Sequence, residues 1–450
     1  MDGRDTIAAL ATATGPGAVT ILRLSGPGAF SILARLCPGP SPAPRELVLR
    51  PVIDPATGEL IDRALVVRFP APASFTGEDV AEIQAHGGAL LADALLSAAL
   101  AAGARAARPG EFSRRAFEGG RLDLAQAEGL AELISAGSEA GLRAARALFG
   151  GELSREVGAL LERLEGLQAR LEALIDFPEQ SGALDEEALA RDLAALRARL
   201  GALHRSHAEG RRRREGARVL LVGAPNVGKS SLFNALVGHA RAIVHAEPGT
   251  TRDAVEGRLE LHGLGVTLVD SAGVREAPGE VEAEGVERTR RALEAADLIL
   301  WVQDLGEEAP ADPATAQLLG QVGEGQRILP VGNKRDRAGE GASHPLPVSA
   351  LTGEGLGALR EALAGALGAA GEGSGGEAGV VLTLARHEAA AGIALEALEQ
   401  AEALRAAGGG LDALSEELGE ARRQLAGILG RIALPEALLD RIFGDFCLGK

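Results

Sequence analysis

The stretch GAPNVGKSS (Gly223–Ser231) decides the fold of the middle of the chain, because it fits the pattern G-x-x-x-x-G-K-[ST]. An apolar run (Val219–Val222) precedes it and a helical pattern (Ser231–Val237) follows, which is the context that this pattern requires. Glycines let backbone N–H groups surround a phosphate, Lys229 bridges phosphates, and the Ser230 hydroxyl ligates Mg²⁺. The alternative is a glycine turn in an ordinary strand–helix unit, and the flanking strand and helix favour the phosphate site.

The tetrapeptide NKRD (Asn333–Asp336) ends another apolar run and indicates which base is bound. The Asp336 carboxylate can accept hydrogen bonds from N1–H and from the exocyclic amine of guanine, a pair of donors that adenine does not offer. The wrong base would leave that buried carboxylate unpaired. SAL (Ser349–Leu351), after a further strand-like run, fits a loop behind the guanine. NKRD alone is common, but in this order after a phosphate loop it predicts GTP rather than ATP.

Two motifs between the phosphate loop and NKRD have the character of switch segments, GTTRD (Gly249–Asp253) and DSAG (Asp270–Gly273). Thr251 is expected to offer its hydroxyl to Mg²⁺ when a γ-phosphate holds its loop. Asp270 ends a strand and is expected to hold the metal through water, while the N–H of Gly273 is directed to the γ-phosphate. Each motif alone could be a plain turn, and their order after the phosphate loop favours the switch function.

The residue that orients the attacking water is not evident from the motifs. Ras-like enzymes place a glutamine directly after DxxG, and here that position is Val274. The segment that follows offers five carboxylates, of which one would suffice, and most of them fit a solvated helix face. They are Glu276, Glu280, Glu282, Glu284 and Glu287.

The distribution of apolar residues predicts a multidomain α/β plus all-α protein. Residues 217–367 alternate strand and helix patterns, which is typical of a mostly parallel sheet with helices on both faces. Residues 1–117 hold β-like runs and one long helix over 89–104, and predict a small α/β domain. The β-like runs lie at 6–12, 18–26, 65–69 and 80–88.

Two helical blocks flank the α/β insert, at 118–216 and 368–450, and we interpret them as one helical domain split by the insertion. The stretch IDFPEQSG (175–182) breaks the first block, because proline and glycine are unfavourable in a helix interior. A second helix then runs to RRRREG (211–216), which fits a solvated helix end better than a tRNA contact.

Composition narrows the class of protein. The 46 basic and 63 acidic residues give a net charge of −17 over 450 residues. This charge argues against a protein that binds nucleic acid over its whole surface, but it is compatible with one local basic patch. Two cysteines, Cys37 and Cys447, provide no disulfide framework or zinc cluster, so we expect a reducing, cytoplasmic location. The first residues, MDGRD, lack an apolar stretch, and we expect neither a signal peptide nor a membrane span.

Several motifs together resemble a known family. GAPNVGKSSLFNAL, AEPGTTRD, DSAGVRE and NKRD resemble the potassium-dependent GTPases that include Era and MnmE. Four further stretches narrow the resemblance to the MnmE (TrmE) tRNA modification GTPase family, and it covers essentially the whole chain. They are ATATGPGAVTILRLSG (11–26), SFTGEDVAEIQAHGG (74–88), RPGEFSRRAFEGGRLDLAQAE (108–128) and FCLGK (446–450).

The resemblance implies an N-terminal folate-binding α/β domain that also dimerises, a discontinuous helical domain and an inserted Ras-like G domain. It implies a homodimer that works with MnmG, a protein that uses FAD and NADH, in a heterotetramer or larger complex. Together they would add an aminomethyl or carboxymethylaminomethyl group to carbon 5 of the tRNA wobble uridine. The one-carbon donor would be 5-formyl- or methylene-tetrahydrofolate, and K⁺-activated GTP hydrolysis would control pairing of the G domains.

Residue by residue, the resemblance assigns a potassium site to Asn226 and Thr250, with backbone carbonyls of His245 and Glu247. It selects Glu282 as the catalytic group that positions water. The folate site maps to Arg23, Glu82, Arg121 and Lys450, with Arg121 standing where a lysine is common. The nucleotide-binding set is Asn226, Gly228, Lys229, Ser230, Ser231, Thr250, Thr251, Asp270, Gly273, Asn333, Lys334, Asp336, Ser349 and Ala350.

Cys447 has two interpretations. The family brings its C-terminal tail to the folate pocket, so the thiol could act in the modification chemistry; alternatively it packs as a small apolar residue, as most free cysteines do. Two other functions compete with this one: a ribosome-assembly GTPase similar to Era, and a folate-binding scaffold with a residual G domain. The acidic total and FCLGK argue against the first, and the intact Lys229, Asp270 and Asp336 argue against the second.

Overall fold

The computed structural model describes residues 5–13, 15, 17–177, 179, 185–238, 256–270, 290–306, 312–323, 326–339, 344–369, 380–444, 446 and 449. The chain divides into two compact units. One comprises Met1–Ala131, Leu148–Leu200 and Ala390–Lys450, and the other Glu132–Ala147 and Gly201–Ala389. No helix within the described ranges combines the length and apolar content that a membrane crossing needs.

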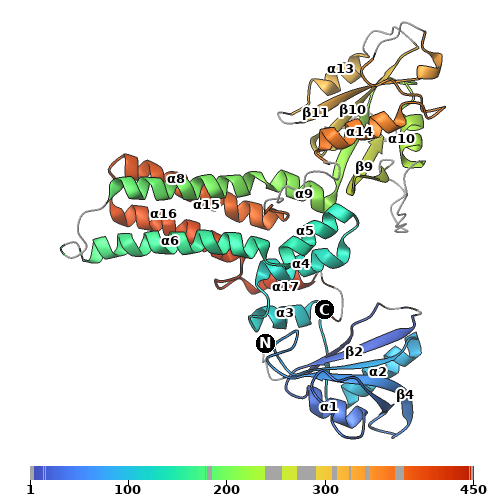
Figure 1. The fold of residues 1–450 in the computed structure, drawn as a ribbon, viewed down its shortest axis with the longest axis vertical. Coiled ribbons are helices and arrows are strands. Elements are labelled where there is room, and N and C mark those ends of the chain that lie inside the picture. The colour runs from blue at the N-terminus through green and yellow to red at the C-terminus, as the bar shows by residue number, and fades with distance from the viewer. Residues whose placement is uncertain are drawn as a thin grey trace. The chain divides into compact units, whose positions relative to one another are not determined.

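A six-stranded sheet forms the N-terminal part of the first unit, in the order β3-β4-β5-β2-β1-β6. Neighbouring strands are antiparallel except β1 and β6. The strands are β1 (Ile7–Leu10), β2 (Val19–Ser25), β3 (Val48–Ile53), β4 (Leu60–Phe69), β5 (Val80–His86) and β6 (Arg105–Ala106). Helices α1 (Ala29–Leu36) and α2 (Ala89–Ala101) cover one face of this sheet (Figure 1). Leu22 and Leu24 belong to the core beneath them, and the alternation of the strand leaves Arg23 on the opposite face.

The α/β pattern expected for this region is confirmed, with three omissions. Strands β1, β2, β4 and β5 and helix α2 lie where the apolar runs predict them. Sequence reasoning missed β3, β6 and α1. Strand β3 carries Arg50 and Pro51 at the edge of the sheet, where a missing N–H is tolerated, so it has no clean apolar alternation.

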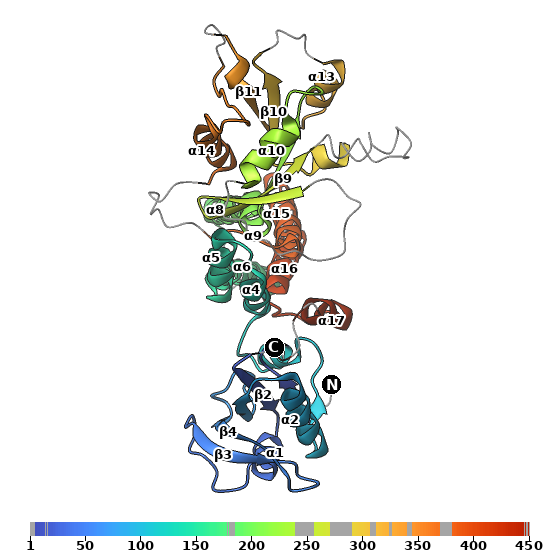
Figure 2. The same ribbon diagram turned by 90° about the vertical axis from the view of Figure 1, so that its right-hand side faces the viewer.

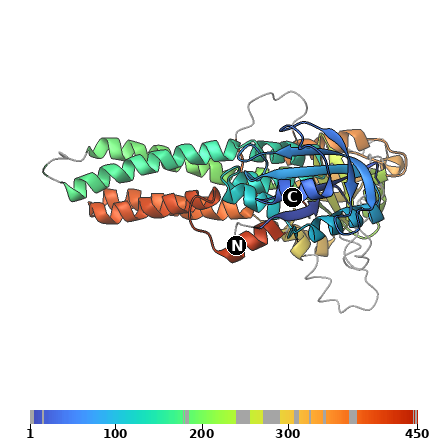
Figure 3. The ribbon, with the colours of Figure 1, turned by 90° about the horizontal axis from the view of Figure 1, so that it is seen from below.

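Helices make up most of the rest of the first unit, and three of them, α4, α8 and α15, continue into residues of the second. They are α3 (Glu111–Glu118), α4 (Leu124–Ser135), α6 (Glu152–Asp176), α8 (Glu186–Arg205), α15 (Ala385–Ala406), α16 (Leu411–Ile428) and α17 (Glu436–Gly444). Figures 1 and 3 show α6, α8, α15 and α16 running side by side. Ion pairs join their exposed edges, such as Arg170–Asp192 between α6 and α8 and Arg197–Glu402 between α8 and α15. The end of α6 at Asp176 agrees with the break predicted at 175–182.

The second unit is built on a five-stranded sheet in the order β11-β10-β7-β9-β8, in which only β8 is antiparallel to its neighbour. The strands are β7 (Ala217–Val222), β8 (Glu256–Leu261), β9 (Leu264–Asp270), β10 (Leu298–Asp304) and β11 (Arg327–Asn333). The described helices beside it include α10 (Lys229–Gly238), α13 (Pro313–Leu319) and α14 (Leu356–Leu367). Alternate residues of β7 enter separate apolar clusters, Leu221 with α10 and α14, and Leu220 with α13 (Figure 2). Helices therefore cover both faces, as predicted.

Two details of the second unit differ from the sequence prediction. The strand-like run before SAL is reduced to one isolated bridge, Gly332 with Pro347. The helix expected to end in RRRREG is interrupted at Ser206, and α9 (His207–Glu215) starts anew. The Ser206 hydroxyl donates to the carbonyl of Leu203 at 2.6 Å and accepts from the N–H of Leu382 at 3.0 Å, so side-chain hydrogen bonds compete with the helix there.

Gly110 offers a test of how α3 and α17 pack. Gly110 has φ +65°, and a Cβ added to it would lie 2.2 Å from the carbonyl oxygen of Phe443. Gly120 has nearly the same φ, +66°, with nothing within 4 Å. Gly120→Ala should therefore cost only the left-handed backbone, ~1 kcal/mol, whereas Gly110→Ala adds an overlap that raises the loss to ~3 kcal/mol. Calorimetry should show a much larger fall in melting temperature for Gly110→Ala; equal falls would contradict the packing.

Candidate functional site

The phosphate loop connects β7 to α10 and takes its shape from residues with left-handed backbones. Asn226 has φ +63° and Gly228 has φ +88°. Lys229, the first residue of α10, donates from Nζ to the carbonyl oxygens of Gly223 and Ala224, both at 2.9 Å. The ammonium is thus held against the loop at the N-terminus of a helix, where backbone N–H groups favour an anion.

Ser230 and Asp270 meet at the carboxyl ends of two parallel strands. Asp270 is the last residue of β9 and pairs in register with Leu221 of β7. The Ser230 hydroxyl donates to Oδ2 of Asp270 at 2.6 Å, and the aspartate is 3% exposed. A hydroxyl and a carboxylate at this spacing are the oxygen donors that a small hard cation such as Mg²⁺ prefers.

Asn333 joins the phosphate loop to the base-binding loops. Its side-chain amide donates to the carbonyl oxygens of Val227 at 2.9 Å and Gly228 at 3.4 Å, and its Oδ1 accepts from the N–H of Ala350 at 3.1 Å. The residue is only 2% exposed, so these bonds are shielded from water. The structure therefore brings together three motifs that are far apart in the sequence.

Asp336 lies in the short helical turn after β11, with one carboxylate oxygen fixed. The Ser349 hydroxyl donates to Oδ1 of Asp336 at 2.5 Å, and the N–H of Arg335 donates to the carbonyl of Val348 at 3.0 Å. Ser349 is itself fully buried. A hydroxyl that orients the carboxylate explains why a serine in the SAL loop accompanies Asp336, the residue predicted to bind the base.

Asp304 is a residue of this region that sequence reasoning missed. It ends β10 beside Asn333, and its Oδ2 lies 2.6 Å from Nζ of Lys334. Burial alone would raise the pKa of Asp304, but hydrogen bonds from Lys334 and from the N–H of Gly306, with the charges of Lys334 and Arg337, lower it below its usual range. An aspartate at the end of the apolar run LILWVQD, level with the NKRD strand, was the available signal.

Eight predicted site residues lie outside the described residues. They are His245, Glu247, Thr250, Thr251, Gly273, Glu282, Cys447 and Lys450. Their roles stay predictions. The other cysteine, Cys37, is buried in the N-terminal core, and burial raises its pKa to about 12 despite the nearby charge of Arg50. A thiol with that pKa is not a nucleophile at neutral pH.

A second polar site lies on the face of the N-terminal sheet opposite α1 and α2, beside Phe75 and Phe112. Arg23 of β2 and Glu82 of β5 are directly opposite in register and form an ion pair of 2.9 Å between Nε and Oε1. The Arg23 guanidinium lies 5.8 Å from the ring centres of Phe75 and Phe112. It also donates to the carbonyl of Gly449 at 3.4 Å, which brings the chain's last described residue to the pair.

Arg121 is exposed and lies against the turn that precedes β5. Its Cγ would be 3.3 Å from a Cβ added to Gly77, so its aliphatic stem runs along the backbone of the SFTGED turn. The aromatic and charged side chains around Arg23 are suited to a flat, polar ligand with an anionic group.

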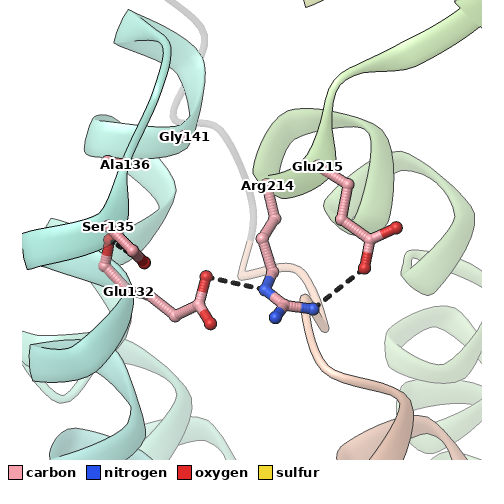
Figure 4. A pocket seen from close by; sticks show the side chains of 6 residues that line it. All are labelled: Glu132, Ser135, Ala136, Gly141, Arg214 and Glu215. Atoms are coloured by element: carbon pink, nitrogen blue, oxygen red, sulfur yellow. Dashed lines mark hydrogen bonds and ion pairs between the residues drawn. The ribbon is translucent and has the colours of Figure 1, made fainter. Parts of the chain in front are cut away.

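A polar cavity of about 200 Å³ lies within the second unit and is lined by Glu132, Ser135, Ala136, Gly141, Arg214 and Glu215 (Figure 4). Arg214 of α9 points into it between two carboxylates, donating from Nε to Glu132 at 2.6 Å and from Nη1 to Glu215 at 3.0 Å. The arginine of this cavity is already paired with protein carboxylates. We therefore interpret the Arg214–Glu132 ion pair as a structural link between α4 and α9, and not as part of a ligand site.

Two family patterns match most of the chain. One, described as the GTP-binding protein TrmE N-terminus, matches residues 6–121, and the MnmE helical domain matches residues 124–447. The tRNA modification GTPase MnmE of Myxococcus xanthus is 46% identical over 448 residues, which are 99% of this chain and 99% of the relative. The chain belongs to the MnmE (TrmE) family.

A second relative agrees with membership in the MnmE family. The tRNA modification GTPase MnmE of Thermus thermophilus is 44% identical over 452 residues, 99% of this chain and 99% of the relative. Among solved structures, the G domain of the T. maritima FeoB iron transporter is 27% identical with a TM-score of 0.25, covering 33% of this chain and 98% of that chain. The resemblance and the fold class predicted from the motifs are confirmed: this MnmE family member is a GTPase of tRNA modification that binds GTP.

Asp336→Asn tests the base site of this MnmE family member. An amide donates where the carboxylate accepted, so GTP affinity should fall about 100-fold or more, while xanthosine triphosphate, which carries a carbonyl at position 2, should gain affinity. Displacement of a fluorescent nucleotide measures both constants. Lys229→Ala serves as a control that weakens both nucleotides alike, and unchanged GTP binding by Asp336→Asn would contradict the assignment.

Proposed function

We propose that the chain is a K⁺-activated GTP hydrolase that acts with the FAD-dependent MnmG on the wobble uridine of tRNA. It would help add an aminomethyl or carboxymethylaminomethyl group to carbon 5, with 5-formyl- or methylene-tetrahydrofolate as the one-carbon donor. The observation that carries the coupling to folate is the hydrogen bond between Arg23 and the carbonyl of Gly449, because it joins the C-terminal tail to the predicted folate residues.

For GTP hydrolysis, each of the proposed residues contacts a different part of the nucleotide or its metal ion. Lys229 and the N-terminal N–H groups of α10 bind phosphate, and Asp336 binds the base edge. Ser230 and Thr251 are the proposed Mg²⁺ ligands, and Asp270 holds the metal through water. Asn226, exposed in the phosphate loop with φ +63°, is the proposed side-chain ligand of K⁺. Bound K⁺ would supply positive charge where other GTPases use an arginine finger. Glu282 is the proposed group that orients water.

In the one-carbon part, Arg23, Glu82, Arg121 and Lys450 are the proposed folate residues. The donor set fits this ligand, because the Arg23 and Glu82 side chains are 23% and 13% exposed and so keep part of their polar edges accessible. Arg23 and Arg121 would bind the anionic glutamate tail, and Glu82 would accept from the amino-pyrimidine edge of the pterin. Cys447 stays a proposed participant in the chemistry.

The proposed assembly is a homodimer formed through the N-terminal domain, joined by MnmG and tRNA in the cytoplasm. Support comes from family membership along the whole chain, since the N-terminal and helical patterns are both present. GTP hydrolysis would control pairing of the G domains, which we assign to residues 217–367. The domains flanking it are proposed at 1–117, 118–216 and 368–450.

GTPase rates in K⁺ and in Na⁺ at equal ionic strength test the hydrolytic part. The wild-type rate should be higher in K⁺ by about tenfold or more, because the bound cation stabilises charge in the transition state. Glu282→Ala should lower the rate in K⁺ by about 100-fold, whereas Glu280→Ala, from the same acidic segment, should retain it. Equal wild-type rates in the two salts would count against the potassium site.

Arg23→Met tests the folate part. Losing a charged donor should weaken binding of 5-formyl-tetrahydrofolate by about tenfold or more, as measured by calorimetric titration. Arg35→Met is the matched control, because Arg35 lies on α1 and donates to the carbonyl of Ala102 on the covered side of the sheet. GTPase rates should stay unchanged in both variants. Wild-type folate affinity in Arg23→Met would remove this site from the proposal.

A further inference from the structure

Lys334 is held by a carboxylate from a different strand. Its Nζ lies 2.6 Å from Oδ2 of Asp304, and the two side chains are 24% and 10% exposed. The other oxygen of Asp304 accepts from the N–H of Gly306 at 2.9 Å. Both carboxylate oxygens are therefore engaged, so the aspartate is a fixed anchor rather than a mobile surface group.

The anchored lysine crosses the phosphate loop. Lys334 has a left-handed backbone, φ +61°, at the start of the turn that carries Asp336. Its Cε lies 4.0 Å from the position that a Cβ on Gly228 would occupy. The methylene stem thus runs between the base-recognition turn and the phosphate loop, with Asp304 at its far end.

The energetic consequence concerns the entropy of a long side chain. A lysine side chain has many rotamers, and binding a ligand against it costs the freedom that it loses. An ion pair with a partly buried carboxylate, both of whose oxygens already have a polar partner, removes this rotamer freedom before the ligand binds. The register that places Asp304 beside Asn333 sets this geometry through the backbone of two parallel strands.

We propose that Asp304 is a positioning residue for guanine-nucleotide binding, acting through Lys334. Its carboxylate fixes the lysine stem across the phosphate loop before the nucleotide arrives. The inference rests on the proposed base site at Asn333–Asp336. It predicts that a change at Asp304 acts on nucleotide affinity only while Lys334 is present.

The test is a double-mutant cycle in the full chain with fluorescently labelled GDP. Asp304→Asn keeps the shape and removes the charge, and it should weaken binding about two- to tenfold, mainly through faster dissociation. Lys334→Met should weaken binding at least as much. The double variant should bind no more weakly than Lys334→Met alone, because the aspartate then has nothing to position.

Asp297→Asn is the matched control on the same strand. Asp297 directly precedes β10, and its carboxylate accepts from the N–H of Arg218 at 2.9 Å and pairs with Arg211. At 7% exposure its side chain is as buried as that of Asp304, so its loss should lower the melting temperature similarly and leave GDP affinity unchanged. This control separates positioning from a general loss of stability.

Three outcomes would overturn the inference: wild-type affinity in Asp304→Asn, additive effects in the double variant, or an equal loss of affinity in Asp297→Asn. Failure of the base site has a different signature. If Lys334→Met and Asp336→Asn both bound GDP as the wild type does, the nucleotide would not lie at NKRD at all. If those two variants weakened binding and Asp304→Asn did not, only the role of Asp304 would fall.

Discussion

One buried amide keeps the nucleotide-binding loops at a fixed spacing. Asn333, which is only 2% exposed, donates to two carbonyls of the phosphate loop and accepts from the N–H of Ala350. A nucleotide has to be held at both its phosphates and its base, so loops from different strands must stay in register with one another. A cluster of neutral hydrogen bonds in a low-dielectric setting does this without burying a charge.

The same geometry explains where glycine is required. A Cβ at Gly228 would lie 2.4 Å from Nδ2 of Asn333, and the residue also has φ +88°. Both the backbone conformation and the close approach exclude a side chain. At the other end of the sheet, a Cβ at Gly216 would lie 2.7 Å from the carbonyl of Gly265, where the chain enters β7 beside the start of β9. Strand β9 starts beside Gly216 and ends at Asp270. It therefore links this close backbone contact to the end of the sheet where the proposed metal donors lie.

Local sequence was sufficient to predict the parts of the fold that have strong hydrophobic periodicity or a recognisable loop motif. The phosphate loop, NKRD and the strands leading into them follow from spacing alone, since each loop must sit at the carboxyl end of a parallel strand. It was insufficient where the partner is remote. Strand β3 depends on an edge position, the break at Ser206 depends on Leu382, and the Asp304–Lys334 pair depends on the register of two strands. None of these partners is visible within a sequence window.

The contact between Arg23 and Gly449 shows how far such dependence reaches, because 426 residues separate its members. A Cβ on Gly449 would lie 2.0 Å from the carbonyl of Leu10, so the tail needs glycine to reach the strand. Closing so long a loop for one weak hydrogen bond would be unfavourable on its own. Helix α17 removes most of that cost: Arg114 pairs with Glu436 and Asp440, and Phe443 packs on Phe117, within the same unit. With α17 docked, the loop that the contact between Arg23 and Gly449 closes is much shorter than 426 residues, so its entropic cost is correspondingly smaller.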